Sequence, residues 1–472
     1  MSQRLPILYN KKPCYDIVFS HTFEEFPQEL QDLGVENRKV CIYTDSNVEK
    51  LYAKQIQELL EPVCRKVILF SFPAGEEHKT LDTIKEAYKT LIEAGFDRKD
   101  LILALGGGVV GDMAGYTAAT YLRGIDFVQV PTTLLAQCDS SIGGKTGVDF
   151  DGYKNMVGAF HMPRLVYMNL ATLKTLDDRQ FYNGFAEVMK HGLIKDAIFY
   201  EWLIDKMYEI CERDLDTLEE MIMRSCTVKK LVVEKDPKEQ GERALLNFGH
   251  TIGHAIEKYK NFTLSHGECV ALGCVAAAFI SWKHELLTME EYYEVRDMFV
   301  PFNLPISVED IDPQEILRLT KSDKKMKDGT LQFILLKRVG KAMRDTSVTD
   351  EDILEPLPDK KVIYATSLSV MPEIESGKLA VDVAELEKKK AWGAFLPTLS
   401  MNAGIGTGHL SGTDYTFGSQ IWDKFNESIG LTISIPIFSN RQYKTAYNKA
   451  KYAITTSQLE LLNTQKQLLQ TV

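Results

Sequence analysis

The chain contains a group of histidine, carboxylate and lysine side chains of the types that serve a catalytic metal ion. They lie on two expected helices and in a short segment that follows them: Glu187, Lys190, His250, His254, Glu257 and His266. His250, His254 and Glu257 are spaced four and three residues apart, which places them on one face of a helix. Imidazole and carboxylate ligands that leave one position open suit a catalytic divalent metal. The pattern predicts a metal site but leaves open which three groups bind the ion.

Glycine-rich segments in the first half of the chain have the composition of phosphate sites. The segment GGGVVGD (106–112) follows an apolar run and opens an expected helix, whose first N–H groups can approach a phosphate. Its spacing is not that of the strict dinucleotide motif, so a structural tight turn is the alternative. Lys145 and Lys154 accompany two further glycine-rich loops, 139–149 and 152–158, and suit a phosphate or carboxylate. Solvated surface lysines are the alternative there.

Polar residues also end two expected strands. Asp45 and Asn47 lie where they could contact a nucleotide ribose or base, or simply cap the next helix. Thr132 and Thr133 end another strand, at the edge where parallel sheets bind ligands. Together with the metal group, these residues indicate redox chemistry on a small, anionic, hydroxylated substrate.

Two folding patterns must position these groups. In residues 1–176, short apolar runs alternate with helical segments, and the expected strands are 38–45, 66–73, 101–108, 127–133 and 165–170. This alternation predicts a parallel α/β sheet. From 177 to 357 long helical patterns dominate, with one late strand at 331–339, which predicts a mostly helical second domain.

The last segment, 358–472, differs from the rest of the chain in composition and charge. It lacks cysteine and carries 12 basic and 10 acidic residues, whereas the whole chain has a formal charge of −11. A helix is expected at 372–394, then two strands with alternating apolar residues at 396–406 and 427–438, then a helix at 441–472. We therefore expect a separate helix–strand–strand–helix tail.

The overall composition is that of a globular protein. Of 472 residues, 44% are hydrophobic and 26% charged, and no long basic block stands out, so nucleic acid is not an expected partner. The eight cysteines form no C-x-x-C pair, which is typical of reduced thiols in a cytoplasmic protein. We expect no signal peptide and no membrane helix.

A series of ordered motifs carries a family resemblance: PAGEEHK (73–79), GGGVVGD (106–112), YLRG (121–124), VPTTLLAQCDSSIGGKT (130–146), KNMVGAF (154–160), GFAEVMKHG (184–192), LNFGHTIGHAIE (246–257), SHGE (265–268) and SDKK (322–325). Through them, residues 1–357 resemble the 3-dehydroquinate synthase family. The resemblance implies a Rossmann-like NAD-binding domain over 1–176 and a mostly α-helical metal and substrate domain over 177–357. It also implies NAD, Zn²⁺ or Co²⁺ as cofactors, and a homodimer.

The resemblance assigns roles to individual residues. It implies that Glu187, His250 and His266 bind the metal, which leaves His254 as a catalytic or substrate-contacting group. The implied NAD contacts are Asp45, Asn47, Gly75, Glu76, Glu77, His78, Lys79, Gly108, Val109, Val110, Gly111, Asp112, Thr132, Thr133, Asp139, Lys145, Lys154, Thr172, Leu173, Lys174 and Thr175. The implied substrate contacts are Arg123, Asp139, Lys145, Asn155, Lys190, Lys229, Arg243, Asn247 and one of Lys324 and Lys325.

The implied reaction belongs to the shikimate pathway, which leads to chorismate and the aromatic amino acids. It converts 3-deoxy-D-arabino-heptulosonate 7-phosphate into 3-dehydroquinate and phosphate by transient oxidation with NAD, phosphate elimination, re-reduction and aldol cyclisation. The alternatives are a sugar-phosphate cyclase of the inosose or valiolone type and a metal-dependent polyol dehydrogenase. Lys145, Lys154, Asn155 and Arg243, which suit a phosphate, argue against the dehydrogenase.

The tail carries a second resemblance. Its segments 371–408 and 429–450 make residues 362–472 similar to part of a TolC-type outer-membrane efflux protein. A cytoplasmic enzyme and an envelope fragment belong to different compartments. We therefore expect a fused or artefactually joined segment; the alternative is an envelope efflux component that contacts a membrane only if it is exported.

Overall fold

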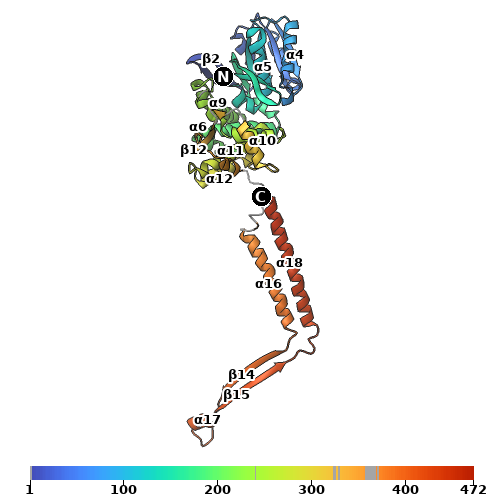
Figure 1. Ribbon diagram of the computed structural model, residues 1–472, viewed down its shortest axis with the longest axis vertical. Helices are drawn as coiled ribbons and strands as arrows, with labels where there is room; N and C mark the ends of the chain where they lie inside the picture. Colours follow the sequence, from blue (N-terminus) through green and yellow to red (C-terminus); the bar gives the residue numbers. More distant parts are fainter. Residues whose placement is uncertain are drawn as a thin grey trace. The chain divides into compact units, whose positions relative to one another are not determined.

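The computed structural model describes residues 3–239, 241–322, 326–327, 330–356, 368 and 371–471. Lys324 and Lys325, one of which is an expected substrate contact, lie outside the described residues. The chain divides into two compact units, Met1–Pro358 and Asp359–Val472 (Figure 1).

The first unit is built on a seven-stranded sheet with the order β1-β2-β9-β6-β5-β3-β4. The strands are β1 (Gln3–Tyr9), β2 (Lys12–Ser20), β3 (Lys39–Asp45), β4 (Lys66–Phe72), β5 (Leu101–Gly106), β6 (Asp126–Pro131) and β9 (Leu165–Asn169). The pairings from β2 to β4 are parallel, and only β1 is antiparallel to its neighbour. The predicted parallel α/β sheet is thus confirmed.

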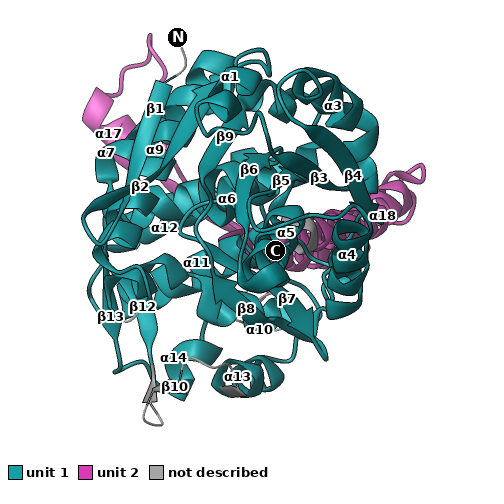
Figure 2. Cartoon of the chain, turned by 90° about the horizontal axis from the view of Figure 1, so that it is seen from above, with its two compact units in different colours: residues 1–358 teal, residues 359–472 magenta. Residues whose placement is uncertain are grey.

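Helices cover both faces of this sheet because its central strands are apolar on both sides. On β5, Ile102 and Ala104 pack against α4 (Leu81–Glu93) and α5 (Gly108–Thr120). Leu101 and Leu103 of the same strand pack against α1 (Phe26–Gln31) and α3 (Lys54–Leu60). Figure 2 shows the two helix pairs on opposite sides of the strands. A continuous apolar run is what a strand buried on both faces requires.

Two parts of the sheet region differ from the sequence prediction. The segments expected as glycine-rich loops form an antiparallel hairpin, β7 (Lys145–Phe150) with β8 (Tyr153–Phe160). Gly147 and Gly158 pair opposite one another in it, which weakens the apolar alternation that marks a strand. The strands β1 and β2 were also not predicted, and Pro6 interrupts the apolar pattern of β1; proline is tolerated there because β1 is the edge strand.

Helices dominate the rest of the first unit. They are α6 (Asp178–Lys195), α7 (Ala197–Asp205), α8 (Met207–Cys211), α9 (Leu215–Lys235), α10 (His250–Tyr259), α11 (His266–Lys283), α12 (Met289–Asp297), α13 (Pro313–Ser322) and α14 (Asp350–Leu354). The late strand expected at 331–339 is β12 (Phe333–Arg338), and β13 (Lys341–Asp345) pairs with it. A short pair, β10 (Met326–Lys327) and β11 (Thr330–Leu331), precedes them. Helices α6 and α11 are buried on nearly all sides, so they form the centre of this part.

The second unit has the predicted helix–strand–strand–helix order, with α17 (Phe417–Asp423) between the strands. Helices α16 (Pro372–Gly393) and α18 (Gln442–Thr471) lie side by side. Strands β14 (Thr398–Gly406) and β15 (Asn426–Ser434) form an isolated antiparallel pair. Leu399 lies opposite Ile433 and Met401 opposite Leu431, so one face of this exposed hairpin is apolar. None of the described helices is both long enough and apolar enough to cross a bilayer.

Candidate active site

The three expected metal ligands meet at one point although they come from three helices. Glu187 lies in the middle of α6, whereas His250 and His266 are the first residues of α10 and α11. Oε1 of Glu187 lies 3.2 Å from Nε2 of His266 and 3.4 Å from Nε2 of His250. One ligand atom from each residue lies within 4.8 Å of the other two. The arrangement has the size of a site for a single ion.

The helix starts that carry the two histidines are fixed by the local sequence. Gly249 has a φ of 78°, and a Cβ there would lie 2.5 Å from Sγ of Cys274. Gly267 lies so close to α6 that a Cβ would approach the carbonyl oxygen of Asn183 to 2.0 Å. Glycine at both positions therefore lets α10 and α11 approach their neighbours closely enough to bring the imidazoles to Glu187.

The chemistry of these donors fits a divalent cation. Nδ1 of His250 lies 3.1 Å from the carbonyl oxygen of Phe248 and must donate to it, so the lone pair of the neutral ring is on Nε2. Burial lowers the pKa of His250 to about 3, and the ammonium of Lys190 acts in the same direction. A lone pair and a carboxylate oxygen therefore face each other, which is unfavourable unless a cation lies between them. Burial alone would raise the pKa of Glu187, but Lys190 and the imidazoles hold it well below its usual range.

A row of alternating charges extends from the metal group. Lys190, which is 1% exposed, forms an ion pair with Oε2 of Glu187. Asp139 also raises the pKa of Lys190, against the effect of burial. Lys229 donates to Oδ1 of Asp139 at 2.7 Å and to its carbonyl oxygen. These buried ammonium groups can bind anionic or hydroxyl oxygens of a substrate beside the metal.

A second cluster gathers three of the expected substrate contacts around one carboxylate. Glu239 forms an ion pair with Lys145 and accepts a hydrogen bond of 3.1 Å from Nδ2 of Asn247. Burial opposes ionisation of Glu239, but these two residues and Arg243 lower its pKa. Arg243 itself donates to the carbonyl oxygen of Pro237 at 2.8 Å. Lys145, Asn247 and Arg243 are suited to binding an anionic group. In this structure the carboxylate of Glu239 is the anion that they surround.

A third cluster joins an expected NAD contact to an expected substrate contact. Nζ of Lys79 donates to Oδ2 of Asp112 at 2.8 Å and to Oδ1 of Asn155 at 2.7 Å. Lys154 on β8 reaches Oε1 of Glu257 on α10 at 2.8 Å. The hairpin β7–β8 therefore connects the sheet to the helices that carry the metal group.

The remaining expected NAD contacts surround the carboxyl ends of the parallel strands. Asp45 ends β3, and Asn47 comes shortly after it. The other contacts come after β4, β5, β6 and β9, in that order: Gly75 to His78, Gly108 to Gly111, Thr132 and Thr133, and Thr172 to Thr175. Helix α5 starts without a side-chain cap, so its first N–H groups are available to a phosphate. Asp45 caps the short helix α2 (Ser46–Val48), with Oδ1 accepting from the N–H of Asn47 at 2.8 Å. The structure thus shows the capping alternative for Asp45 directly.

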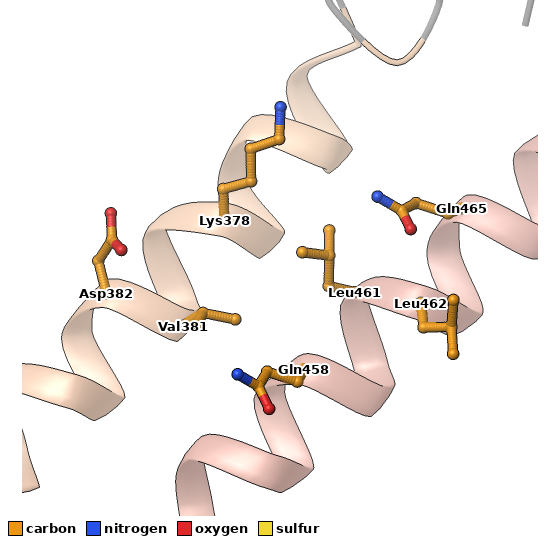
Figure 3. A pocket seen from close by; sticks show the side chains of 7 residues that line it. All are labelled: Lys378, Val381, Asp382, Gln458, Leu461, Leu462 and Gln465. Carbon is orange, nitrogen blue, oxygen red and sulfur yellow. The ribbon is translucent and has the colours of Figure 1, made fainter. Parts of the chain in front are cut away.

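Some residues fall outside this pattern or were missed. Arg123 is exposed at the end of the short helix η3 (Tyr121–Arg123), with a φ of 67°, and belongs to none of these clusters. Sequence reasoning missed Glu239, which no spacing marks. It also missed the buried His191, although this residue lies four positions after Glu187 on the same helix face. A groove of about 470 Å³ lies between α16 and α18, and its lining residues, Lys378, Val381, Asp382, Gln458, Leu461, Leu462 and Gln465, belong to none of these clusters (Figure 3).

Comparisons with known proteins agree with this geometry. The model of the 3-dehydroquinate synthase N-terminal part matches residues 69–183, and that of the C-terminal part matches residues 184–326. The chain belongs to the 3-dehydroquinate synthase family. It is accordingly a phosphate-eliminating cyclase, a lyase of aromatic biosynthesis. Neither family model extends into Asp359–Val472.

Individual relatives place the chain within this family. The 3-dehydroquinate synthase of Acetivibrio thermocellus is 45% identical over 72% of this chain and 94% of that protein. The 2-epi-5-epi-valiolone synthase of Streptomyces hygroscopicus, solved with NAD⁺ and Zn²⁺, is 28% identical, with a TM-score of 0.69 over 75% of this chain and 98% of that one. A 2-deoxy-scyllo-inosose synthase solved with carbaglucose-6-phosphate, NAD⁺ and Co²⁺ is 27% identical, with a TM-score of 0.68 over the same shares.

Proposed function

We propose that the first unit uses NAD⁺ and a divalent metal, Zn²⁺ or Co²⁺, to convert 3-deoxy-D-arabino-heptulosonate 7-phosphate into 3-dehydroquinate and phosphate. The observation that carries the proposal is the approach of Oε1 of Glu187 to Nε2 of both His250 and His266. The metals and nucleotide in the two solved cyclases support the choice of cofactors. The 45% identity to a 3-dehydroquinate synthase, against 27–28% to the inosose and valiolone synthases, supports the choice of substrate.

The proposed division of labour assigns the metal to Glu187, His250 and His266. When bound, NAD⁺ accepts and returns a hydride while the metal polarises a substrate oxygen. Lys190 neutralises the buried Glu187 and supplies a cation beside the reacting hydroxyl. The ring centroid of His254 lies 5.2 Å from that of His250 and 6.0 Å from that of His266, and this proximity supports the proposed catalytic or substrate-contacting role of His254.

The phosphate and carboxylate of the substrate need cationic partners. We assign them to the cluster around Glu239, where Lys145, Asn247 and Arg243 gather, and to the buried Lys229. These groups would hold the phosphate as it leaves and charge builds on its oxygens. Asn155, Arg123 and one of Lys324 and Lys325 complete the proposed substrate contacts.

For NAD⁺ we propose the residues at the carboxyl ends of the parallel strands, together with Lys79 and Asp112, Asp139, Lys145 and Lys154. The glycines at the start of α5 allow a phosphate to approach its N–H groups. This assignment makes residues 1–176 the NAD-binding domain and 177–357 the metal and substrate domain.

The cellular setting is also a proposal. We infer a cytoplasmic homodimer that does not bind nucleic acid. Eight cysteines without a disulfide and a formal charge of −11 support this setting. Light scattering coupled to size-exclusion chromatography tests the dimer.

For the second unit we propose a relationship to part of a TolC-type efflux protein, as a segment joined to the enzyme. The exposed hairpin β14–β15 between the long helices α16 and α18 supports it. Sequencing the transcript across residues 340–380 tests whether both units are made as one chain. Membrane fractionation of the cells tests an envelope role.

The decisive experiment for the enzyme is an assay of phosphate release by the purified, metal-loaded chain. We expect release from the heptulosonate phosphate and little or none from glucose 6-phosphate. Preferred turnover of a sugar phosphate that lacks the carboxylate would instead identify the inosose or valiolone type of cyclase.

A further inference from the structure

A buried imidazole beside the metal group has no role in the assignments above. His191 of α6 is fully buried, and its Nδ1 lies 2.8 Å from Oγ of Ser225 on α9. Its Nε2 has no hydrogen-bond partner within the described part of the chain. Oδ1 of Asp139, on the short helix η4 (Ala136–Ser140), lies 3.8 Å from Nε2. His191 therefore lies where α6, α9 and η4 meet.

The surroundings of His191 select one tautomer. Burial lowers its pKa to about 3, with Lys190 acting in the same direction, so the ring is neutral. If Nδ1 carried the proton, the lone pair of Nε2 would face the carboxylate of Asp139, which is repulsive. If Ser225 donates its hydroxyl proton to Nδ1, the N–H of Nε2 faces Asp139 instead. The second tautomer satisfies the serine hydroxyl and directs a donor at the carboxylate.

We propose that His191 is a positioning residue that orients the carboxylate of Asp139 toward a hydroxyl group of the bound substrate. A buried N–H without an acceptor is costly, and 3.8 Å exceeds hydrogen-bond length, so a small rotation of Asp139 completes the contact when substrate binds. The contacts of His191 and Lys229 both fall on Oδ1, which leaves Oδ2 for the substrate. This inference rests on the proposed function, because it refines how that substrate is held.

Two other roles for the same residues fit less well. The order Ser225, His191, Asp139 is that of a nucleophilic triad, but Ser225 is fully buried and cannot meet a substrate. Oxygen and nitrogen atoms of Asp139, Glu187 and His191 also lie within 4.8 Å of one another, as in a metal site. There, however, Glu187 is already assigned to the site with His250 and His266, and the ammonium group of Lys229 neutralises Asp139.

A matched pair of variants in the full, metal-loaded chain tests the proposal. The amide of His191→Gln can place an N–H where Nε2 was, whereas that of His191→Asn reaches only the position of Nδ1. We expect His191→Asn to raise the KM for the heptulosonate phosphate about ten- to hundredfold, the range for a hydrogen bond to a charged group. His191→Gln should restore KM to within about threefold of the unmodified chain. A substitution that only misfolds a fraction of the molecules would instead lower the apparent kcat and leave KM unchanged.

An Asp139→Asn background provides the second readout. There, His191→Asn should have no further effect on KM, because the carboxylate it orients is absent. Metal content should stay unchanged in both His191 variants. Equal KM values for the Gln and Asn variants, or an undiminished effect in the Asp139→Asn background, would overturn the role of His191. Absence of turnover in the unmodified chain would instead overturn the proposed function.

Discussion

Oε1 of Glu187 lies 3.4 Å from Nε2 of His250, although one residue is in the middle of α6 and the other begins α10. The N–H of Nδ1 of His250 donates to the carbonyl oxygen of Phe248, so the lone pair of Nε2 faces the carboxylate of Glu187. A cation between these two atoms would relieve the repulsion, so loss of either ligand should weaken metal binding.

Glu187→Gln should abolish both metal retention and turnover. An amide oxygen carries no charge to compensate the ion, and Lys190 would lose its buried partner. We expect turnover to fall by more than about a hundredfold, beyond the loss typical of groups that only support a ligand. Elemental analysis and phosphate release measure the two effects. Glu201→Gln, at an exposed position of α7, is the control, and full metal content in Glu187→Gln would refute the ligand assignment.

His250→Ala should have the same outcome, because it removes a second ligand from the same site. The measurement is again metal content by elemental analysis, together with kcat. His284→Ala, which removes a histidine of similar burial that contacts Asp352 instead, controls for the loss of an imidazole. Stoichiometric metal in the His250→Ala protein would contradict the prediction.

NAD⁺ should not be consumed during turnover. In the proposed reaction NAD⁺ would accept a hydride and return it within one catalytic cycle, so the absorbance of NADH should stay flat while phosphate accumulates. Recording both signals in one reaction checks this. Steady formation of NADH in proportion to substrate would identify a dehydrogenase instead.

Gly267→Ala should weaken the first unit and displace His266. The added methyl group would approach the carbonyl oxygen of Asn183 to 2.0 Å, and backbone cannot move aside cheaply. We expect a loss of about 1–3 kcal/mol in unfolding free energy, together with weaker metal binding. Urea unfolding and metal titration measure these effects. Gly393→Ala, where nothing lies within 4 Å of the new methyl group, should change neither.

Glu268→Gln should destabilise the protein at pH 7 but not in acid. Glu268 caps the start of α11 in a capping box with Ser265 and pairs with Arg179 at 2.9 Å. Burial opposes ionisation, but Arg179 and the N–H of Ser265 hold the pKa of Glu268 below its usual range. A lowered pKa gives stability that is fully present above the unfolded pKa and lost as the pH falls through the folded one.

The measurement compares the unfolding free energies of the unmodified and Glu268→Gln chains between pH 7 and pH 3. We expect a difference of about 1 kcal/mol at pH 7, typical of a helix cap, that shrinks below about pH 4. A difference that is constant over this range would show that the charge of Glu268 contributes nothing.

Removing the second unit should leave catalysis unchanged. All described groups of the candidate site lie within Met1–Pro358, which has its own apolar cores. A chain that ends at residue 358 should match the kcat/KM of the full chain and scatter less light in solution. The second effect is expected because the hairpin β14–β15 exposes Leu399, Met401 and Ile433 on one face. A large fall in kcat/KM would show that the tail supports the enzyme.

Local patterns revealed much of the fold and the residue types of the site. The apolar run of β5 and the glycines after it predicted a parallel strand followed by a helix, and both are present. The β7–β8 hairpin escaped prediction because Gly147 and Gly158 pair opposite each other, without side chains to show the alternation. Pro6 concealed β1 because proline argues against a strand unless the strand lies at the edge of a sheet. The edge position of β1 depends on the whole sheet and is not visible in the local sequence.

The sequence by itself determined that histidines and carboxylates suited to a metal occur beside glycine-rich phosphate segments, and that a parallel sheet precedes a helical part. Spacing along one helix could not choose between His250 and His254, nor show that Glu239 joins Lys145 to Asn247. Only the tertiary structure brings His250 and His266 to Glu187 and Glu239 to Lys145, because these contacts join residues distant in the chain. Their geometry depends on how closely α6, α10 and α11 pack, which the glycines permit but do not specify.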